Sequence, residues 1–191
     1  MLFLKKANYT NINREVISNE ENFLLGKDET LLPKFTNIFG NNYTVNVYYL
    51  RIKNPELNLT ENCINISLPI SFRKRNNQDL LNVILFKMYR KITEIELENV
   101  FEEARHIFGF APENYEIKKL DRVLATCNFD LQTIFISPYI SMYSKEIIKY
   151  IVFHEFCHLK YKTHSKKFYE MLSKYVPNYE KISKTLPNLK Y

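Results

Sequence analysis

The sequence predicts an α+β protein, because strand-like and helix-like hydrophobic patterns occupy separate stretches of its 191 residues. Alternating apolar residues come first, a long stretch at helical spacing follows, and short strand-like and helical segments complete the chain. Hydrophobic residues make up 46% of the chain and charged residues 25%, as in an ordinary globular protein. This length suits one domain, or one domain with an appendage, and can bury a sizeable core.

The N-terminal part carries the first strand signals. Residues 35–39, the turn at Gly40 and the alternating run that follows predict a hairpin. Three apolar residues of that run share one face: Val45, Val47 and Tyr49. A further strand is expected at residues 63–68, ended by Pro69. Residues 1–25 are polar and irregular, so we expect a loosely attached lead segment there.

One long stretch, from Pro69 to Gly109, has helical periodicity and contains neither Gly nor Pro between these two residues. Its apolar residues include Leu81, Ile84, Leu85, Met88, Ile92, Ile95, Val100, Ala104 and Ile107. Asn77 or Asp79 can cap its start, and Gly109 supplies its end. We expect one long helix, or two helices with a break near Thr93.

Short elements are predicted in the remainder of the chain. The strand-like segments lie at residues 115–120, 123–127 and 132–137. Ser144 is placed to cap a helix that runs to about Lys160. Pro177 and Pro187 then separate two short final helices.

The composition excludes several classes of protein. Three cysteines without a C-x-x-C pair predict reduced thiols, and not a disulfide framework or a zinc ribbon: Cys63, Cys127 and Cys157. We expect Cys127 and Cys157 to pack in the core. No apolar run approaches the roughly 20 residues that cross a bilayer, so no membrane span is predicted. The first residues do not have the order of a signal peptide, and we expect a cytoplasmic protein.

The histidines carry the chemistry. Residues 154–158 read His-Glu-Phe-Cys-His, and a third histidine, His164, follows after five residues. On a helix His154 and His158 lie one above the other, so both imidazoles can bind one metal ion. The surrounding residues are nearly all apolar, and buried imidazoles need polar partners or a metal. Chance or core packing is the alternative, and the third histidine argues against it.

The ligand count favours a catalytic metal over a structural one. Three nitrogen ligands leave the fourth tetrahedral position open for water. Glu155 directly follows the first histidine, so its carboxylate flanks the site, where a general base would act. An oxyanion donor is also needed, and the sequence does not choose among four nearby candidates: Tyr139, Tyr143, Tyr161 and Tyr169.

The motif and its surroundings resemble the YgjP-like metallopeptidase family, a relative of the SprT-like zinc proteases. That family has an aromatic residue before H-E-L-x-H, five residues to H-S-x-x-F-W, and a proline further on. The matching residues are Tyr150, His154, Glu155, His158, His164, Ser165, Phe168 and Pro177, with Tyr169 where Trp is usual. The same histidine spacing occurs in metzincins, but Tyr161 stands where their turn has Gly.

The resemblance implies a zincin-like fold over residues 26–191, with a β-rich part at about 26–75 and a catalytic part at about 76–191. It also implies one zinc ion per chain, held by His154, His158 and His164. The expected function is zinc-dependent hydrolysis of peptide or protein substrates, with a zinc-activated water and Glu155 as general base. We expect a hydrolase that does not act at a membrane.

The sequence departs from the family upstream of the motif. Residues 123–127 read Val-Leu-Ala-Thr-Cys where the family typically has R-W-G-S-C, so only Thr126 and Cys127 follow the pattern. This difference motivates a second hypothesis: a non-catalytic relative in which zinc only fastens the helix to the C-terminal segment.

The C-terminal segment motivates a third hypothesis. Residues 159–191 contain eight Lys and two Glu, with interleaved aromatic residues, which is a mixture that can bind nucleic acid. A DNA-associated protein of the SprT-like kind would use this segment. The alternative is a solvated basic helical face, which the lack of Arg in the segment favours.

Overall fold

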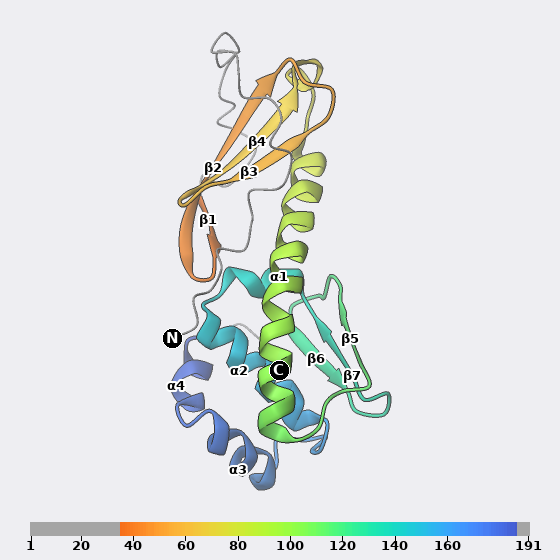
Figure 1. Cartoon of the computed structure of the whole chain (residues 1–191), viewed down its shortest axis with the longest axis vertical. Coiled ribbons are helices and arrows are strands. Elements are labelled where there is room, and N and C mark those ends of the chain that lie inside the picture. The colour runs from red at the N-terminus through yellow and green to blue at the C-terminus, as the bar shows by residue number, and fades with distance from the viewer. Residues whose placement is uncertain (1–34, 187–191) are drawn as a thin grey trace. The chain divides into compact units, whose positions relative to one another are not determined.

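A computed structural model of the chain describes residues 35–186 and confirms the α+β class (Figure 1). Its described residues form two compact units. The first contains residues 35–37 and 42–84, and the second contains residues 38–41 and 85–186. The lead segment expected at residues 1–25 and the helix boundary expected at Pro187 lie outside the described residues.

The first unit is built on a four-stranded sheet with the order β1-β2-β4-β3. The strands are β1 (Phe35–Ile38), β2 (Asn41–Leu50), β3 (Glu56–Leu59) and β4 (Cys63–Pro69). The predicted hairpin and the predicted strand at 63–68 are confirmed, and Val45, Val47 and Tyr49 are buried on one face. Strand β3 was not predicted, because it is a short edge strand with only two apolar residues.

Strands β2 and β4 pair in parallel. Strand β3 lies between them in the sequence and pairs antiparallel with β4 at the edge of the sheet. Asn46 and Asn65 face each other in the ladder between β2 and β4, and the side-chain amide of Asn46 donates to the side-chain oxygen Oδ1 of Asn65 at 3.0 Å. This bond satisfies the buried side chain of Asn46, which lies on the opposite face of β2 from Val45, Val47 and Tyr49.

The long helix α1 (Gln78–Phe108) is continuous, so the alternative of a break near Thr93 is wrong. The buried Thr93 hydroxyl donates to the Pro138 carbonyl at 2.7 Å, which lets a polar residue lie within the helix without interrupting it. Gly109 ends the helix in the left-handed conformation, with φ of 71°, and its N–H donates to the Arg105 carbonyl.

The start of α1 differs in detail from the expectation. The side chain of Asn76 accepts the Gln78 N–H at 3.1 Å. The Asn77 amide instead donates to the Tyr49 hydroxyl and to the Phe72 carbonyl, so it anchors the sheet residue Tyr49. Asp79 lies in the first turn, where its negative charge interacts favourably with the positive end of the helix dipole.

The second unit contains a three-stranded sheet with the order β5-β7-β6. The strands are β5 (Asn114–Ile117), β6 (Ala125–Asn128) and β7 (Thr133–Ile136), each shorter than predicted. Strand β7 pairs in parallel with β5 and antiparallel with the edge strand β6. The helices that follow are η2 (Pro138–Met142), α2 (Lys145–His158), α3 (Lys166–Tyr175) and α4 (Tyr179–Lys184), and Pro177 separates the last two as expected.

Helix α2 is the centre of this unit. All its residues from Tyr150 to Cys157 are buried. Phe101 and Phe108 of α1 pack against Phe153 and Phe156 with ring centroids 5.2–5.5 Å apart. Two ion pairs also join α1 to the first half of α2: Glu96 with Lys145 and Glu103 with Lys149, both at 2.6 Å.

The turn between β1 and β2 lies beside the start of α2. The N–H groups of Phe39 and Gly40 donate to the carbonyls of Ser141 and Met142 in η2. Gly40 has φ of 79°, and a Cβ there would lie 3.4 Å from the Ser144 Cβ. Glycine is therefore suited to this position for two reasons: it adopts the positive φ without strain, and it leaves room for Ser144, which directly precedes α2.

Among residues 35–186, the structure has no helix that is long and apolar enough to cross a membrane.

The start of α2 depends on Ser144, whose hydroxyl oxygen accepts the Ile147 N–H at 3.4 Å. We expect Ser144→Ala to lower the free energy of unfolding by about 1 kcal/mol, measured by urea denaturation with a metal chelator present. Ser144→Asp should retain most of the stability, because a carboxylate caps equally well. Ser173→Ala is the control, since that hydroxyl only bonds back to Glu170 within α3. Equal stability of Ser144→Ala and the control would contradict the capping role.

Candidate metal centre

The three histidines of the motif converge in the second unit. Their Nε2 atoms lie 3.2 Å (His154 to His158), 3.1 Å (His158 to His164) and 2.9 Å (His164 to His154) apart. His154 is buried, His158 is half-buried and His164 is exposed. The expected site residues are therefore together, with one imidazole inside the protein and one at its surface.

Helix α3 positions the third histidine. His164 directly precedes Ser165, whose hydroxyl oxygen accepts the Phe168 N–H at 3.3 Å and begins the helix. The segment after α2 thus turns back and presents His164 to the other two residues. The spacing H-S-x-x-F acquires a physical meaning here, because the serine caps the helix at the backbone N–H of Phe168, directly after His164.

The Phe168 ring supports all three imidazoles. It is fully buried, and its centroid lies 4.7–4.9 Å from the centroids of His154, His158 and His164. An apolar ring at this place excludes water from one side of the cluster and fixes the positions of the imidazole rings.

A backbone carbonyl orients His158. Its Nδ1 lies 3.0 Å from the Tyr161 carbonyl oxygen, which accepts hydrogen bonds only. The proton is therefore on Nδ1, and the Nε2 lone pair points toward the other two histidines. The sequence did not indicate this contact, because it depends on the path of the segment after α2.

The surroundings favour neutral imidazoles. Burial, together with the two neighbouring histidines, lowers the pKa of His154 to about 3. Burial also lowers the pKa of His158, partly opposed by the Tyr161 carbonyl, and that of His164. Neutral imidazoles are the form that binds metal ions.

The cluster fits a zinc ion. Tetrahedral zinc with Zn–N bonds of about 2.0–2.1 Å separates its nitrogen ligands by roughly 3.3 Å. The three Nε2 separations of 2.9–3.2 Å are close to that value. Three lone pairs at such distances repel one another, and a shared cation removes the repulsion. The donor set and its spacing are thus those of a three-histidine metal site.

Glu155 lies on the side of α2 that faces β6. Its side chain is buried, and burial raises its pKa to about 8. The backbone N–H of Cys127 donates to the carboxylate and opposes this increase. An edge strand of the small sheet thereby fixes the carboxylate next to His154.

A hollow of about 450 Å³ opens between β6 and His158. Its lining includes Thr126, Cys127 and Asn128 of β6, the rings of Phe129 and Phe135, and the charged residues Asp130 and Lys162. The residues of the segment that departs from the family pattern have two different environments. Leu124 and Ala125 are buried in the core, whereas Thr126 and Cys127 line the hollow.

Comparison with known families assigns the chain. It matches the family model "YgjP-like, metallopeptidase domain" over residues 5–189. The chain belongs to the YgjP-like family. The resemblance inferred from the motif is therefore confirmed, and membership of a metallopeptidase family implies a metal ion, typically zinc.

Solved structures of metallopeptidase zymogens are also similar. Abylysin of Pyrococcus abyssi is 28% identical with a TM-score of 0.44, over 47% of this chain and 90% of that chain. Jannalysin of Methanocaldococcus jannaschii is 24% identical with a TM-score of 0.43, over 48% of this chain and 87% of that chain. No curated protein matches the chain.

The tyrosines that the sequence offered as oxyanion donors, and Cys157, have different environments in this YgjP-like chain. Tyr139 packs edge-on against Phe86 and Tyr89 of α1. Tyr161 contributes its carbonyl, and Tyr169 stacks on His164. The buried Cys157 is a free thiol within the core, as predicted.

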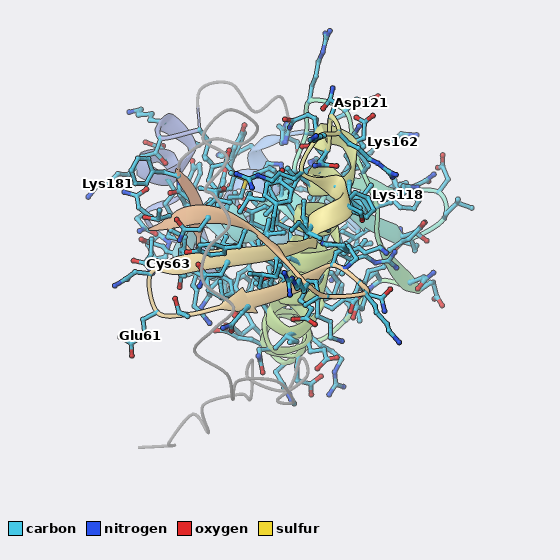
Figure 2. The ribbon with its side chains drawn as sticks, turned by 90° about the horizontal axis from the view of Figure 1, so that it is seen from above. Glu61, Cys63, Lys118, Asp121, Lys162 and Lys181 are labelled. Atoms are coloured by element: carbon cyan, nitrogen blue, oxygen red, sulfur yellow. The ribbon has the colours of Figure 1, made fainter. Side chains whose placement is uncertain are left out.

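The Lys-rich segment is partly engaged with the protein itself. Four lysines between residues 159 and 186 lie against the chain's own rings or carboxylates: Lys160 over Phe110, Lys162 beside Asp130, Lys166 beside Glu170 and Lys174 over Tyr175. Figure 2 labels Lys162 and Lys181. Nucleic acid binding is not supported by the family match.

Phe168 is the common packing partner of the three imidazoles, so its removal leaves a cavity in the core. We expect Phe168→Ala to lower the free energy of unfolding by about 3–5 kcal/mol, measured by urea denaturation with metal chelated. Phe168→Leu should cost less, because most of the volume remains. Leu131→Ala is the control at an exposed turn residue. A Phe168→Ala chain as stable as this control would contradict the supporting role.

Proposed function

We propose that this YgjP-like protein is a zinc-dependent peptidase with one zinc ion per chain on His154, His158 and His164. The observation that carries the proposal is the convergence of three Nε2 atoms within 2.9–3.2 Å beside a buried glutamate. Three nitrogen ligands leave a position open, which is typical of catalytic zinc. When bound, zinc polarises the scissile carbonyl and lowers the pKa of water.

Glu155 is the general base of this proposal. Its carboxylate accepts a proton from water and delivers it to the leaving amine. The ionised form is favoured by the Cys127 N–H and by a cation at the neighbouring histidines, both of which oppose the effect of burial. The fixed position between α2 and β6 holds the carboxylate next to His154 without placing it among the three nitrogen donors.

The hollow between β6 and His158 is the proposed place of the substrate. It reaches from a metal-ligating histidine to the exposed Thr126 and the rings of Phe129 and Phe135. Its volume of about 450 Å³ is in the range of ligand pockets. A peptide or protein segment bound there lies next to His158 and to Cys127, whose backbone N–H donates to the Glu155 carboxylate.

Glu155→Gln tests the general base. We expect the variant to retain zinc, because the three imidazoles are unchanged, and to lose at least about 100-fold in hydrolysis of an unfolded protein substrate. Zinc content is measured by elemental analysis and hydrolysis by release of new amino termini. Glu170→Gln is the control, since Glu170 is an exposed residue of α3. Hydrolysis at the wild-type rate by Glu155→Gln would refute the assigned base.

His164→Ala tests the ligand set. The wild-type chain should contain about one zinc ion, and the variant much less, because two imidazoles remain. His106→Ala is the matched control, since His106 is an exposed histidine of α1 that pairs with Glu102. Equal zinc in the two variants would contradict the three-histidine site. Zinc in the wild type without hydrolysis of any unfolded substrate would favour the non-catalytic hypothesis.

A further inference from the structure

The third histidine is held differently from the other two. His154 and His158 are fixed by helix α2, and His158 is also fixed by the Tyr161 carbonyl. His164 is exposed and lies in the segment between α2 and α3. A ligand in such a segment needs neighbouring groups that restrict its ring orientation, because free rotation weakens metal binding.

Two rings from the first turn of α3 supply this restriction. The Phe168 ring meets the His164 ring edge-on, at 4.7 Å and 84°. The Tyr169 ring lies nearly parallel to it, at 5.9 Å and 27°. The imidazole is thus confined by a perpendicular ring and by a parallel ring.

Tyr169 is itself held by the last helix. Its ring stacks on that of Tyr179, with centroids 5.6 Å apart and an angle of 26°. Three aromatic rings therefore follow one another from the candidate ligand to α4: His164, Tyr169 and Tyr179. Such stacking adds to the stability that comes from burial of apolar area, and it fixes the orientation of the rings relative to one another.

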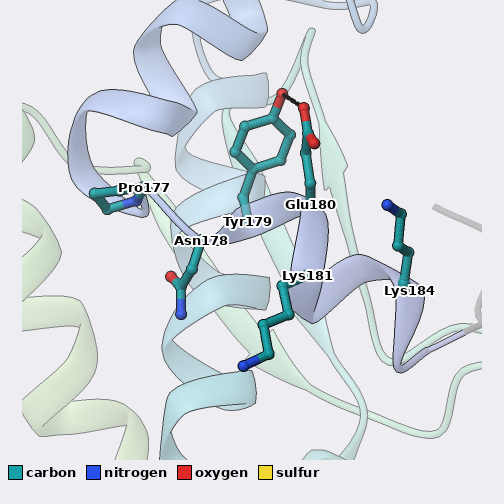
Figure 3. A pocket seen from close by; sticks show the side chains of 6 residues that line it. All are labelled: Pro177, Asn178, Tyr179, Glu180, Lys181 and Lys184. Atoms are coloured by element: carbon teal, nitrogen blue, oxygen red, sulfur yellow. Dashed lines mark hydrogen bonds between the residues drawn. The ribbon is translucent and has the colours of Figure 1, made fainter.

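Helix α4 is tied to the rest of the site. The Asn178 amide donates to the Glu146 carboxylate of α2 at 2.7 Å, and Ile182 is buried in the core. The Tyr179 hydroxyl donates to Glu180 at 3.2 Å, which Figure 3 shows beside a surface hollow lined by residues 177–181 and Lys184. The stack is therefore anchored to the helix that carries the other two histidines.

We infer that Tyr169 is a positioning residue: clamped by Tyr179, its ring holds His164 in the orientation that binds the metal ion. The inference rests on the proposed three-histidine centre and extends it to α4. The ring face acts here, and the hydroxyl does not. Phenylalanine or tryptophan at this position therefore preserves the effect, and alanine removes it.

The test is the release of zinc from the full chain to an excess of a chromogenic chelator, followed by absorbance. We expect Tyr169→Ala to release zinc at least about tenfold faster than the wild type, and Tyr179→Ala to accelerate release by a smaller factor. Tyr169→Phe and Tyr169→Trp should remain within about twofold of the wild type, since both keep an aromatic face.

Tyr115→Ala is the matched control. Tyr115 is 37% exposed and Tyr169 is 39% exposed, and each ring contacts another ring, but Tyr115 packs against Phe101 instead of a histidine. The visible spectrum of the cobalt-substituted protein provides a second measurement, because it reports ligand geometry directly. It should change in Tyr169→Ala and stay unchanged in Tyr115→Ala.

The possible failures are distinguishable. Release of zinc by Tyr169→Ala at the wild-type rate, or equally fast release by Tyr169→Phe and Tyr169→Ala, would overturn the positioning role alone. A wild-type chain that binds neither zinc nor cobalt would overturn the metal centre itself, and this inference with it.

Discussion

The central constraint of this structure is the burial of polar side chains on an apolar helix. Helix α2 carries His154 and Glu155 into the core, where neither can be hydrated. Each must therefore find a polar partner. His154 meets the imidazoles of His158 and His164, and Glu155 meets the Cys127 N–H of β6. The remaining elements of the second unit provide and fix these partners.

The C-terminal helices α3 and α4 contribute to the candidate site together with α2. Helix α3 begins at Ser165, directly after the third histidine, and its Phe168 ring packs against all three imidazoles. Helix α4 reaches back to α2 through the Asn178–Glu146 bond. Local sequence thus forms the helices, while contacts between them set the relative positions of the nitrogen atoms. The proposed function depends on this arrangement, because metal binding is sensitive to sub-ångström changes in ligand position.

Much of the site could be predicted from local patterns. The spacing of His154 and His158, the cap at Ser144 and the end of α1 at Gly109 each depend on residues within a few positions. The contacts that support the site were not predictable in this way. The Tyr161 carbonyl reaches His158 through an irregular segment, and the Cys127 N–H reaches Glu155 across two elements. Hydrophobic periodicity carries no information on such contacts, because they depend on how separate elements pack.

X-ray absorption spectroscopy at the zinc edge of the purified, zinc-loaded protein tests the central claim most directly. The account predicts about three imidazole nitrogens and one oxygen at about 2.0–2.1 Å, the coordination of a three-histidine site with an open position. Sulfur at about 2.3 Å would place a thiol such as Cys127 among the ligands. Sulfur coordination, or fewer than three imidazoles, would contradict the account.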